Sequence, residues 1–260
     1  MGGFTSKILQ GGQAAGAGLM AAGLAGAGVT GAPYVLEGSH LNGGFTQITT
    51  GNTRTLDRIT AGLGESFSIS DIYFKPYTAC RHTHGSAQAA LLLAAEESFA
   101  PADIESIDVK TYMIAGIAVG KGVDENSSFV GAQFSIPYVT AACLLDGDMG
   151  PAQFRQARLA DPELLALTRK VHVQPDEELN DMYPQFTASR VEITLTDGRT
   201  IARQIDAPKG DPRDPMTAAD LTEKLRRFAP VDKRGRADQV AAAALALDAC
   251  DDIQTFTGMI

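Results

Sequence analysis

The stretch that decides the fold is Phe74-Lys75-Pro76-Tyr77-Thr78-Ala79-Cys80-Arg81-His82-Thr83-His84. Pro76 favours an extended or turn conformation at the start of this stretch. Small apolar residues then recur at helical spacing, at Ala87, Ala90, Leu91, Ala94 and Ala95. The pattern predicts a helix over residues 84–98, with a cluster of basic side chains placed just before or at its N-terminus. A helix N-terminus favours anions, so this stretch is a candidate anion-binding site.

The side chains at this predicted helix start suit a carboxylate substrate. Arg81 can make a bidentate contact with a carboxylate, and Lys75 adds a second positive charge. His84 can carry a proton near neutral pH, and a helix N-terminus disfavours its imidazolium form. The stretch therefore suggests a site that binds a polycarboxylate and removes a proton from it.

Composition limits the classes of function that remain. The 260 residues are 44% hydrophobic and 20% charged, which is ordinary for a soluble globular protein of one large or two modest domains. The formal net charge of −9 argues against a general binder of nucleic acid or anionic membranes. Three cysteines without CxxC spacing fit a reducing cytoplasm, where we expect the protein to reside.

Residues near the N-terminus predict a helix that packs closely rather than one that spans a membrane. The stretch from Ile8 to Val29 is rich in glycine and alanine, contains few large apolar residues, and is interrupted by Gln10 and Gln13. Small residues allow another backbone to approach closely. Because the chain offers this helix and the alanine-rich segment 237–250 no obvious partner surface, we expect a homodimer or a complex with a helical partner chain.

The remaining patterns divide the chain into three zones: helical residues 1–66, an α+β zone over 67–209, and helices again over 210–260. Within the α+β zone we predict a strand over 106–114, a helix over 133–146, a helix over 161–169 and a strand over 171–174. A hairpin should pair 190–196 with 199–206 around Asp197-Gly198. Thr217 and Asp220 should cap a helix over 218–228, followed by a helix over 237–250.

Two further motifs accompany the basic stretch. They are Ala132-Gln133-Phe134-Ser135-Ile136-Pro137-Tyr138, followed by Leu144-Leu145-Asp146-Gly147, and Asp211-Pro212-Arg213-Asp214-Pro215-Met216-Thr217. Together the three motifs resemble the second half of the MmgE/PrpD family. That family includes 2-methylcitrate dehydratases, cis-aconitate decarboxylases and iminodisuccinate epimerases.

The resemblance implies an α+β fold in which a partial helical domain, formed by both chain ends, flanks a smaller α+β domain. Family members are longer, and the segment Ser6–Ala15 resembles a point near the middle of their sequence. We therefore expect a half-length gene product, an excised piece or one part of a split enzyme. The implied activity is a lyase or isomerase that abstracts a proton next to a carboxylate of a small di- or tricarboxylate, with a 2-methylcitrate dehydratase as the first choice. The alternative is a non-catalytic or partner-dependent half-subunit that needs a separate helical half.

The resemblance also assigns roles to single residues. It places His84, Lys7 and Tyr138 among the catalytic groups, and the motif residues Arg81, Lys75, Ser135 and Gln133 among those that bind the substrate. His84, Arg81 and Tyr138 should then project into one cleft, with Ser135 capping the helix that carries Tyr138. We interpret His82 as structural. Neither a metal nor another cofactor is predicted, because His82 and His84 lack an evident third ligand and no nucleotide-binding motif is present.

Overall fold

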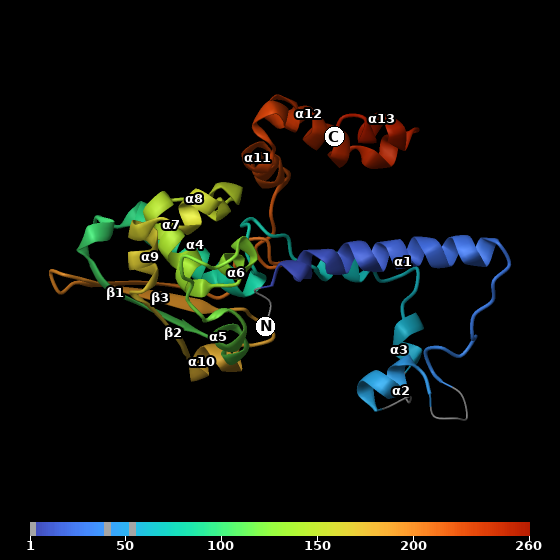
Figure 1. Ribbon diagram of the computed structural model, residues 1–260, viewed down its shortest axis with the longest axis horizontal. Coiled ribbons are helices and arrows are strands. Elements are labelled where there is room, and N and C mark those ends of the chain that lie inside the picture. The colour runs from blue at the N-terminus through green and yellow to red at the C-terminus, as the bar shows by residue number, and fades with distance from the viewer. Residues whose placement is uncertain (1–3, 39–42, 52–55) are drawn as a thin grey trace. The chain divides into compact units, whose positions relative to one another are not determined.

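The computed structural model describes residues 4–38, 43–51 and 56–260 (Figure 1). Contacts within the chain separate an N-terminal unit, Ser6–Ile72, from a larger sheet unit that contains Tyr73–Ile260. The predicted domain boundaries lie near residues 66 and 209, whereas the contacts divide the chain after Ile72. The predicted boundaries stay predictions. The two units are described separately.

The N-terminal unit is helical. Its longest element is α1 (Leu9–Gly26), which confirms the predicted small-residue helix, and α2 (Phe45–Thr50) and α3 (Asp57–Thr60) follow. None of the residues of α1 is buried, and Leu19 is 77% exposed. Among the described residues, no helix combines the length and the apolar character that a membrane span requires.

The sheet unit is built on four strands in the order β2-β1-β3-β4. They are β1 (Ile104–Thr111), β2 (Val171–Pro175), β3 (Ser189–Leu195) and β4 (Thr200–Ile205). β1 pairs in parallel with β2, where Val109 lies opposite Val173, and antiparallel with β3, where Val109 lies opposite Val191. β3 and β4 form the predicted hairpin, whose turn uses Gly198 at a φ of 88°. The mixed sheet confirms the α+β class.

Helices cover the sheet and carry the motifs. α4 (His84–Glu96) packs against β3, β4 and α7 (Ile136–Asp146), and α7 in turn contacts β2 and α9 (Pro162–Thr168). Figure 1 shows α4, α7 and α9 on the same face of the sheet. Smaller helices connect these elements: α5 (Met113–Val119), α6 (Phe129–Gln133), α8 (Gln156–Leu159) and α10 (Glu177–Asp181).

Two element predictions in the predicted α+β zone are corrected. The predicted strand over 106–114 stops at Thr111, since Tyr112 precedes the first turn of α5. The predicted helix over 133–146 begins later, as α7 at Ile136, because Ser135 has extended backbone angles and accepts a hydrogen bond from the Tyr138 amide as the expected N-cap. Pro137 in the first turn of α7 fits this start, where its missing N–H costs nothing.

The core lies between α4, α7 and the sheet. Its largest fully buried side chains include Tyr112, Tyr138, Leu93, Ile107 and Ile193. Gly85, in the first turn of α4, approaches β3 so closely that a Cβ atom there would lie 2.8 Å from the Ser189 hydroxyl oxygen. The start of α4 is therefore pressed against the sheet.

The chain ends in α11 (Ala218–Phe228), α12 (Ala237–Leu245) and α13 (Ile253–Thr257). The predicted capping box is confirmed, with Thr217 and Asp220 each accepting a hydrogen bond from the other's backbone amide. The predicted helix over 237–250 is shorter, because α12 ends at Leu245 and a 3-10 turn, Leu247–Ala249, follows.

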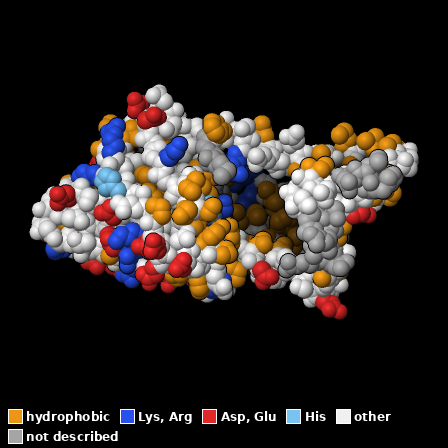
Figure 2. All heavy atoms as spheres, turned by 90° about the horizontal axis from the view of Figure 1, so that it is seen from below, with side chains coloured by type: hydrophobic (Ala, Val, Ile, Leu, Met, Phe, Trp, Pro, Cys, Tyr) orange, Lys and Arg blue, Asp and Glu red, His pale blue; other side chains and the backbone are white. Residues whose placement is uncertain are grey.

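Large apolar side chains remain exposed in both units. In the sheet unit they include Met113, Ile114 and Ile117 on α5, and Figure 2 shows hydrophobic side chains in groups on the face that it presents. Groups of this kind are typical of surfaces that contact another molecule.

Candidate active site

The segment that leads into α4 is held at three points by backbone hydrogen bonds. The amide of Phe74 donates to the Gly210 carbonyl over 2.9 Å, that of Thr78 to Met149 over 3.3 Å, and that of Cys80 to Gln133 over 2.9 Å. These bonds fix the basic stretch against three parts of the chain that are distant in sequence. A short 3-10 turn, Arg81–Thr83, then joins α4 directly.

Arg81 is almost completely buried and binds the chain itself. Its guanidinium donates to the carbonyls of Pro208, over 2.9 Å, and Lys209, over 3.0 Å, and lies 3.6 Å from an Asp211 carboxylate oxygen. It also lies over the ring of Tyr73, 4.4 Å from the centroid. These contacts tie the loop 208–211 to the start of α4. The expected role of Arg81 as a carboxylate anchor stays a prediction.

His84 is fully buried. Its Nε2 atom lies 3.4 Å from the Ala79 carbonyl oxygen, and its Nδ1 atom has no hydrogen-bond partner among the described residues. The ring contacts that of Tyr77, with 5.1 Å between centroids. Burial, and secondly the positive charge of Arg81, lower the pKa of His84 to about 3, so its imidazole is neutral at physiological pH.

His82 is half-buried and has a side-chain partner that sequence patterns did not indicate. Its Nδ1 atom lies 2.5 Å from the hydroxyl oxygen of Tyr112, the residue that follows β1. The rings of Tyr112 and Tyr183 stack with 4.7 Å between centroids. This cluster of His82, Tyr112 and Tyr183 brings together residues from three distant parts of the sequence.

Electrostatics fix the protonation states of the His82–Tyr112 pair. Burial, and then the nearby Lys75 ammonium, lower the pKa of His82, whereas burial raises the pKa of the Tyr112 phenol. At neutral pH the pair is therefore a neutral imidazole beside a protonated phenol. The fully buried phenol can donate to the imidazole, and the half-buried imidazole can exchange a proton with a bound molecule.

Lys75 is exposed and supplies positive charge to this cluster. Its ammonium lowers the pKa of His82, of His84 and of Lys224, so it lies near all three. An exposed ammonium beside neutral hydrogen-bonding groups can attract a carboxylate.

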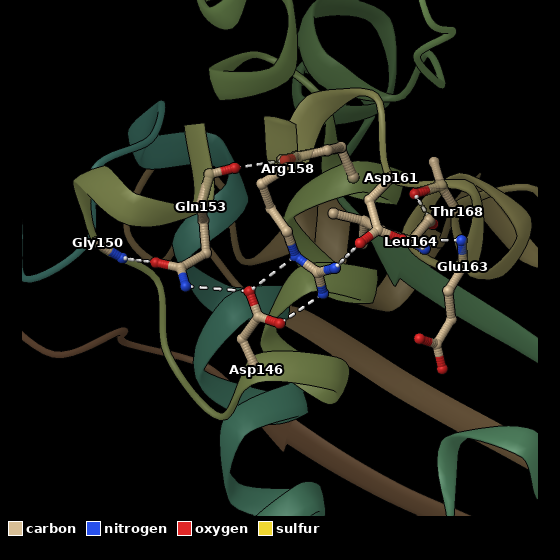
Figure 3. Close-up of polar contacts among 9 residues, drawn as sticks. Asp146, Gly150, Gln153, Arg158, Asp161, Glu163, Leu164 and Thr168 are labelled. Carbon is tan, nitrogen blue, oxygen red and sulfur yellow. Dashed lines mark hydrogen bonds and ion pairs between the residues drawn. The ribbon is translucent and has the colours of Figure 1, made fainter. Parts of the chain in front are cut away.

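Tyr138 belongs to a different polar cluster. Its buried hydroxyl donates to the Gln153 carbonyl, and the Gln153 side chain donates to Asp146 over 3.0 Å. Figure 3 shows that the Arg158 guanidinium lies between two carboxylates, with Nη2 2.5 Å from Asp146 and Nη1 2.6 Å from Asp161. These contacts connect the end of α7 with α8 and α9. The structure therefore directs the Tyr138 hydroxyl to this network, not to the His82–Tyr112 pair.

The other predicted residues are placed as follows. The Ser135 hydroxyl donates to the Lys121 carbonyl over 2.7 Å and caps α7, as expected for an N-cap residue. Gln133 is half-buried, and its carbonyl holds the Cys80 amide. Lys7 lies in the N-terminal unit. Within the part of the chain that is described, no group of three or more His, Cys, Asp or Glu side chains is arranged to hold a metal ion.

The structure thus gathers Lys75, Arg81, His82 and His84 at the start of α4 and adds Tyr112, which sequence reasoning missed. Tyr112 stands directly after a strand that mixes apolar and polar residues, at the carboxyl end of β1. Its position at a strand end was the one signal in the sequence, and it did not reveal the partner 30 residues away.

The described structure is an α+β domain with a mixed four-stranded sheet and a basic, histidine-containing start to its first buried helix. Residues 77–248 match the MmgE/PrpD C-terminal domain, and the chain belongs to this family. The resemblance inferred from the three motifs is confirmed.

Curated relatives carry one activity in their names. A cis-aconitate decarboxylase of Aspergillus terreus is 30% identical over 95% of this chain and 53% of its own length. A cis-aconitate decarboxylase of Homo sapiens is 30% identical over 85% of this chain and 45% of its own length. The chain therefore spans about half the length of the curated relatives it matches.

Proposed function

We propose that the chain takes part in lyase chemistry on a small tricarboxylate of the cis-aconitate class. The observation that carries this proposal is the His82–Tyr112 pair, two neutral proton-exchanging groups 2.5 Å apart beside the exposed Lys75. The names of the relatives support decarboxylation over the dehydration of 2-methylcitrate that the sequence placed first.

Decarboxylation of an unsaturated tricarboxylate needs one proton donor. The bond between a carboxylate carbon and its neighbour breaks and carbon dioxide leaves. The released electron pair forms a new double bond to the next carbon, and the pair of the former double bond shifts to its far carbon. A proton is then added at the far carbon of that system. In this proposal the His82–Tyr112 pair delivers the proton, and Lys75 binds a carboxylate that does not react.

The remaining basic-stretch residues then have supporting roles. Arg81 holds the loop 208–211 in place through its bonds to two carbonyls, and His84 fills the space beneath the turn as a neutral ring. This assignment exchanges the roles expected of the two histidines, because His82 has the hydroxyl partner and the partial exposure that His84 lacks. Lys7 and Gln133 remain candidates for substrate contacts.

The test is turnover of defined substrates. The purified chain is incubated with cis-aconitate, 2-methylcitrate and iminodisuccinate, and products are followed by proton NMR. Loss of carbon dioxide from cis-aconitate supports the proposal, and selective loss of water from 2-methylcitrate would replace it with the dehydratase reading. Epimerisation of iminodisuccinate would leave only the shared proton-transfer chemistry.

A second candidate is a half-subunit that is active only with a helical partner. It is favoured by the coverage of about half of the relatives' length and by the wholly exposed α1, where Leu19 and Met20 are 77% and 65% exposed. Co-purification with the segment that corresponds to the first half of the Aspergillus terreus relative tests it. Activity that requires both chains supports this candidate, and equal activity of the single chain contradicts it.

A further inference from the structure

A cavity of about 500 Å³ lies apart from the candidate active site, between the segment 148–155 and the end of α11 with the turn that follows it. Two contacts join these walls. Arg227 pairs with Asp148, and the Phe228 ring lies 3.3 Å from the position that a Cβ atom on Gly150 would occupy. Neither Lys75, His82 nor Tyr112 lines this cavity.

The cavity is basic in a chain whose net charge is −9. Four arginines line it, Arg155, Arg226, Arg227 and Arg234, against two carboxylates, Asp148 and Glu223, which leaves it two charges positive. The lining is therefore positive, whereas the whole protein is negative.

The arginines fall into two kinds. Arg226 is paired with Glu223 and Asp238, and Arg227 with Asp148. Arg155 and Arg234 form no ion pair with any residue that the structure describes, and they come from the two opposite segments of the wall. Arg234 donates its Nε–H to the Ala229 carbonyl over 3.4 Å, so its Nη groups and the Arg155 guanidinium are the groups offered to a ligand at this cavity.

The lining also contains an apolar part, formed by Phe228, Pro151, Pro230 and Val231. A cavity of this size is in the range of small-molecule sites, which combine apolar walls with a few charged groups. Guanidinium forks recognise carboxylate and phosphate groups in a bidentate manner. We propose that this cavity binds a small polyanion, with one anionic group on Arg155 and a second on Arg234.

Calorimetric titration with three probes at low ionic strength tests this site. Inorganic pyrophosphate and ADP represent phosphate ligands, and citrate represents polycarboxylates. The expected result is saturable binding of at least one probe, weakened about 10-fold or more in Arg155→Gln and in Arg234→Gln, since each removes charge-assisted hydrogen bonds. Tighter binding of pyrophosphate or of citrate identifies which class of anion the cavity takes. Tighter binding of ADP than of pyrophosphate indicates that the apolar wall contacts the adenine ring.

Two controls separate this site from other effects. Arg199→Gln removes an exposed arginine that pairs with Asp197 outside the cavity, so binding should be unchanged. Lys75→Gln removes charge near the candidate active site and should also leave this binding intact. Circular dichroism confirms that each variant folds, and Arg234→Lys should keep part of the affinity. Binding of no probe, or equal affinity in wild type and both cavity variants, would overturn the proposal.

Discussion

The Nδ1 atom of His82 lies 2.5 Å from the hydroxyl oxygen of Tyr112, although 30 residues separate them. One residue precedes α4 and the other follows β1, so the packing of α4 on the sheet unit sets this distance. Both groups are neutral at physiological pH, so the imidazole has a free nitrogen lone pair and the phenol carries its proton. A proton can therefore pass between them without a preceding ionisation step.

Tyr112→Phe should lower turnover by about 100-fold, the usual effect of losing a positioned acid or base. His82→Gln should lower it by a similar factor, and the double variant should add little, because the two groups act as one unit. Steady-state kinetics on the form that is active, alone or with a partner chain, provides the measurement. Full activity in Tyr112→Phe would remove the pair from the mechanism.

Tyr138→Phe should affect stability and leave turnover nearly unchanged. The substitution leaves the Gln153 carbonyl without its donor, which costs about 1–3 kcal/mol in the free energy of unfolding. Urea denaturation and kinetics on the same variant measure both effects. A loss of turnover as large as that of Tyr112→Phe would restore the catalytic role expected from the sequence.

Arg81→Met should destabilise the protein by about 3 kcal/mol, because two carbonyls of the loop 208–211 and Asp211 lose a charged partner. The matched control is Arg199→Met, at an exposed ion pair, where stability should stay nearly unchanged. Urea denaturation compares the two. Unchanged stability combined with a raised KM would identify Arg81 as a substrate anchor instead.

His84 should make stability depend on pH. The pKa of a histidine in the unfolded chain is about 6.5, and burial lowers the pKa of His84 to about 3 in the folded protein. Between these values only the unfolded state binds the proton. The contribution of the neutral His84 to the free energy of unfolding is therefore fully present above about pH 6.5. It falls by about 1.4 kcal/mol for each pH unit below that value, down to about pH 3.

Urea titrations from pH 7 to pH 4 measure this dependence as the difference between wild type and His84→Gln. The wild type should lose more stability than the variant on acidification, because only the wild type carries the buried neutral imidazole. Parallel curves for wild type and His84→Gln would show that His84 is not neutral and buried in the folded state.

Gly85→Ala should destabilise the protein by about 1–3 kcal/mol, since the new methyl group would overlap the Ser189 side chain on β3. In a Ser189→Gly background the same substitution should cost less, because the obstructing atoms are gone. Gly122→Ala is the control, at a glycine with open space around it. Thermal unfolding monitors all four variants, and an equal loss in both backgrounds would place the strain elsewhere.

The elements with strong local signals were predictable. The helix start at His84, the hairpin around Gly198 and the capping box at Thr217 each depend on residues within a few positions of one another. The Ser135 cap of α7 was predicted, but the short helix α6 before it was missed and the start of α7 was placed at residue 133. Local chemistry therefore outweighed periodicity at that point.

The candidate site was predictable only in part. The basic stretch identified its location, but the partners of its side chains come from distant segments: Arg81 binds carbonyls 127 and 128 residues away. No spacing rule connects such positions, because the mixed sheet order brings them together only after folding. The contact between His82 and Tyr112 escaped prediction for the same reason.

The close packing at the start of α4 also bears on how this protein can change over generations. His84, Gly85, Ser86 and Ala87 are all buried, so most substitutions there endanger folding before any new substrate preference can be selected. α5 contacts the turn Arg81–Thr83 yet exposes Met113, Ile114 and Ile117. Heritable variation in specificity should therefore accumulate on α5, and a directed-evolution library would yield more folded members there than at the helix start.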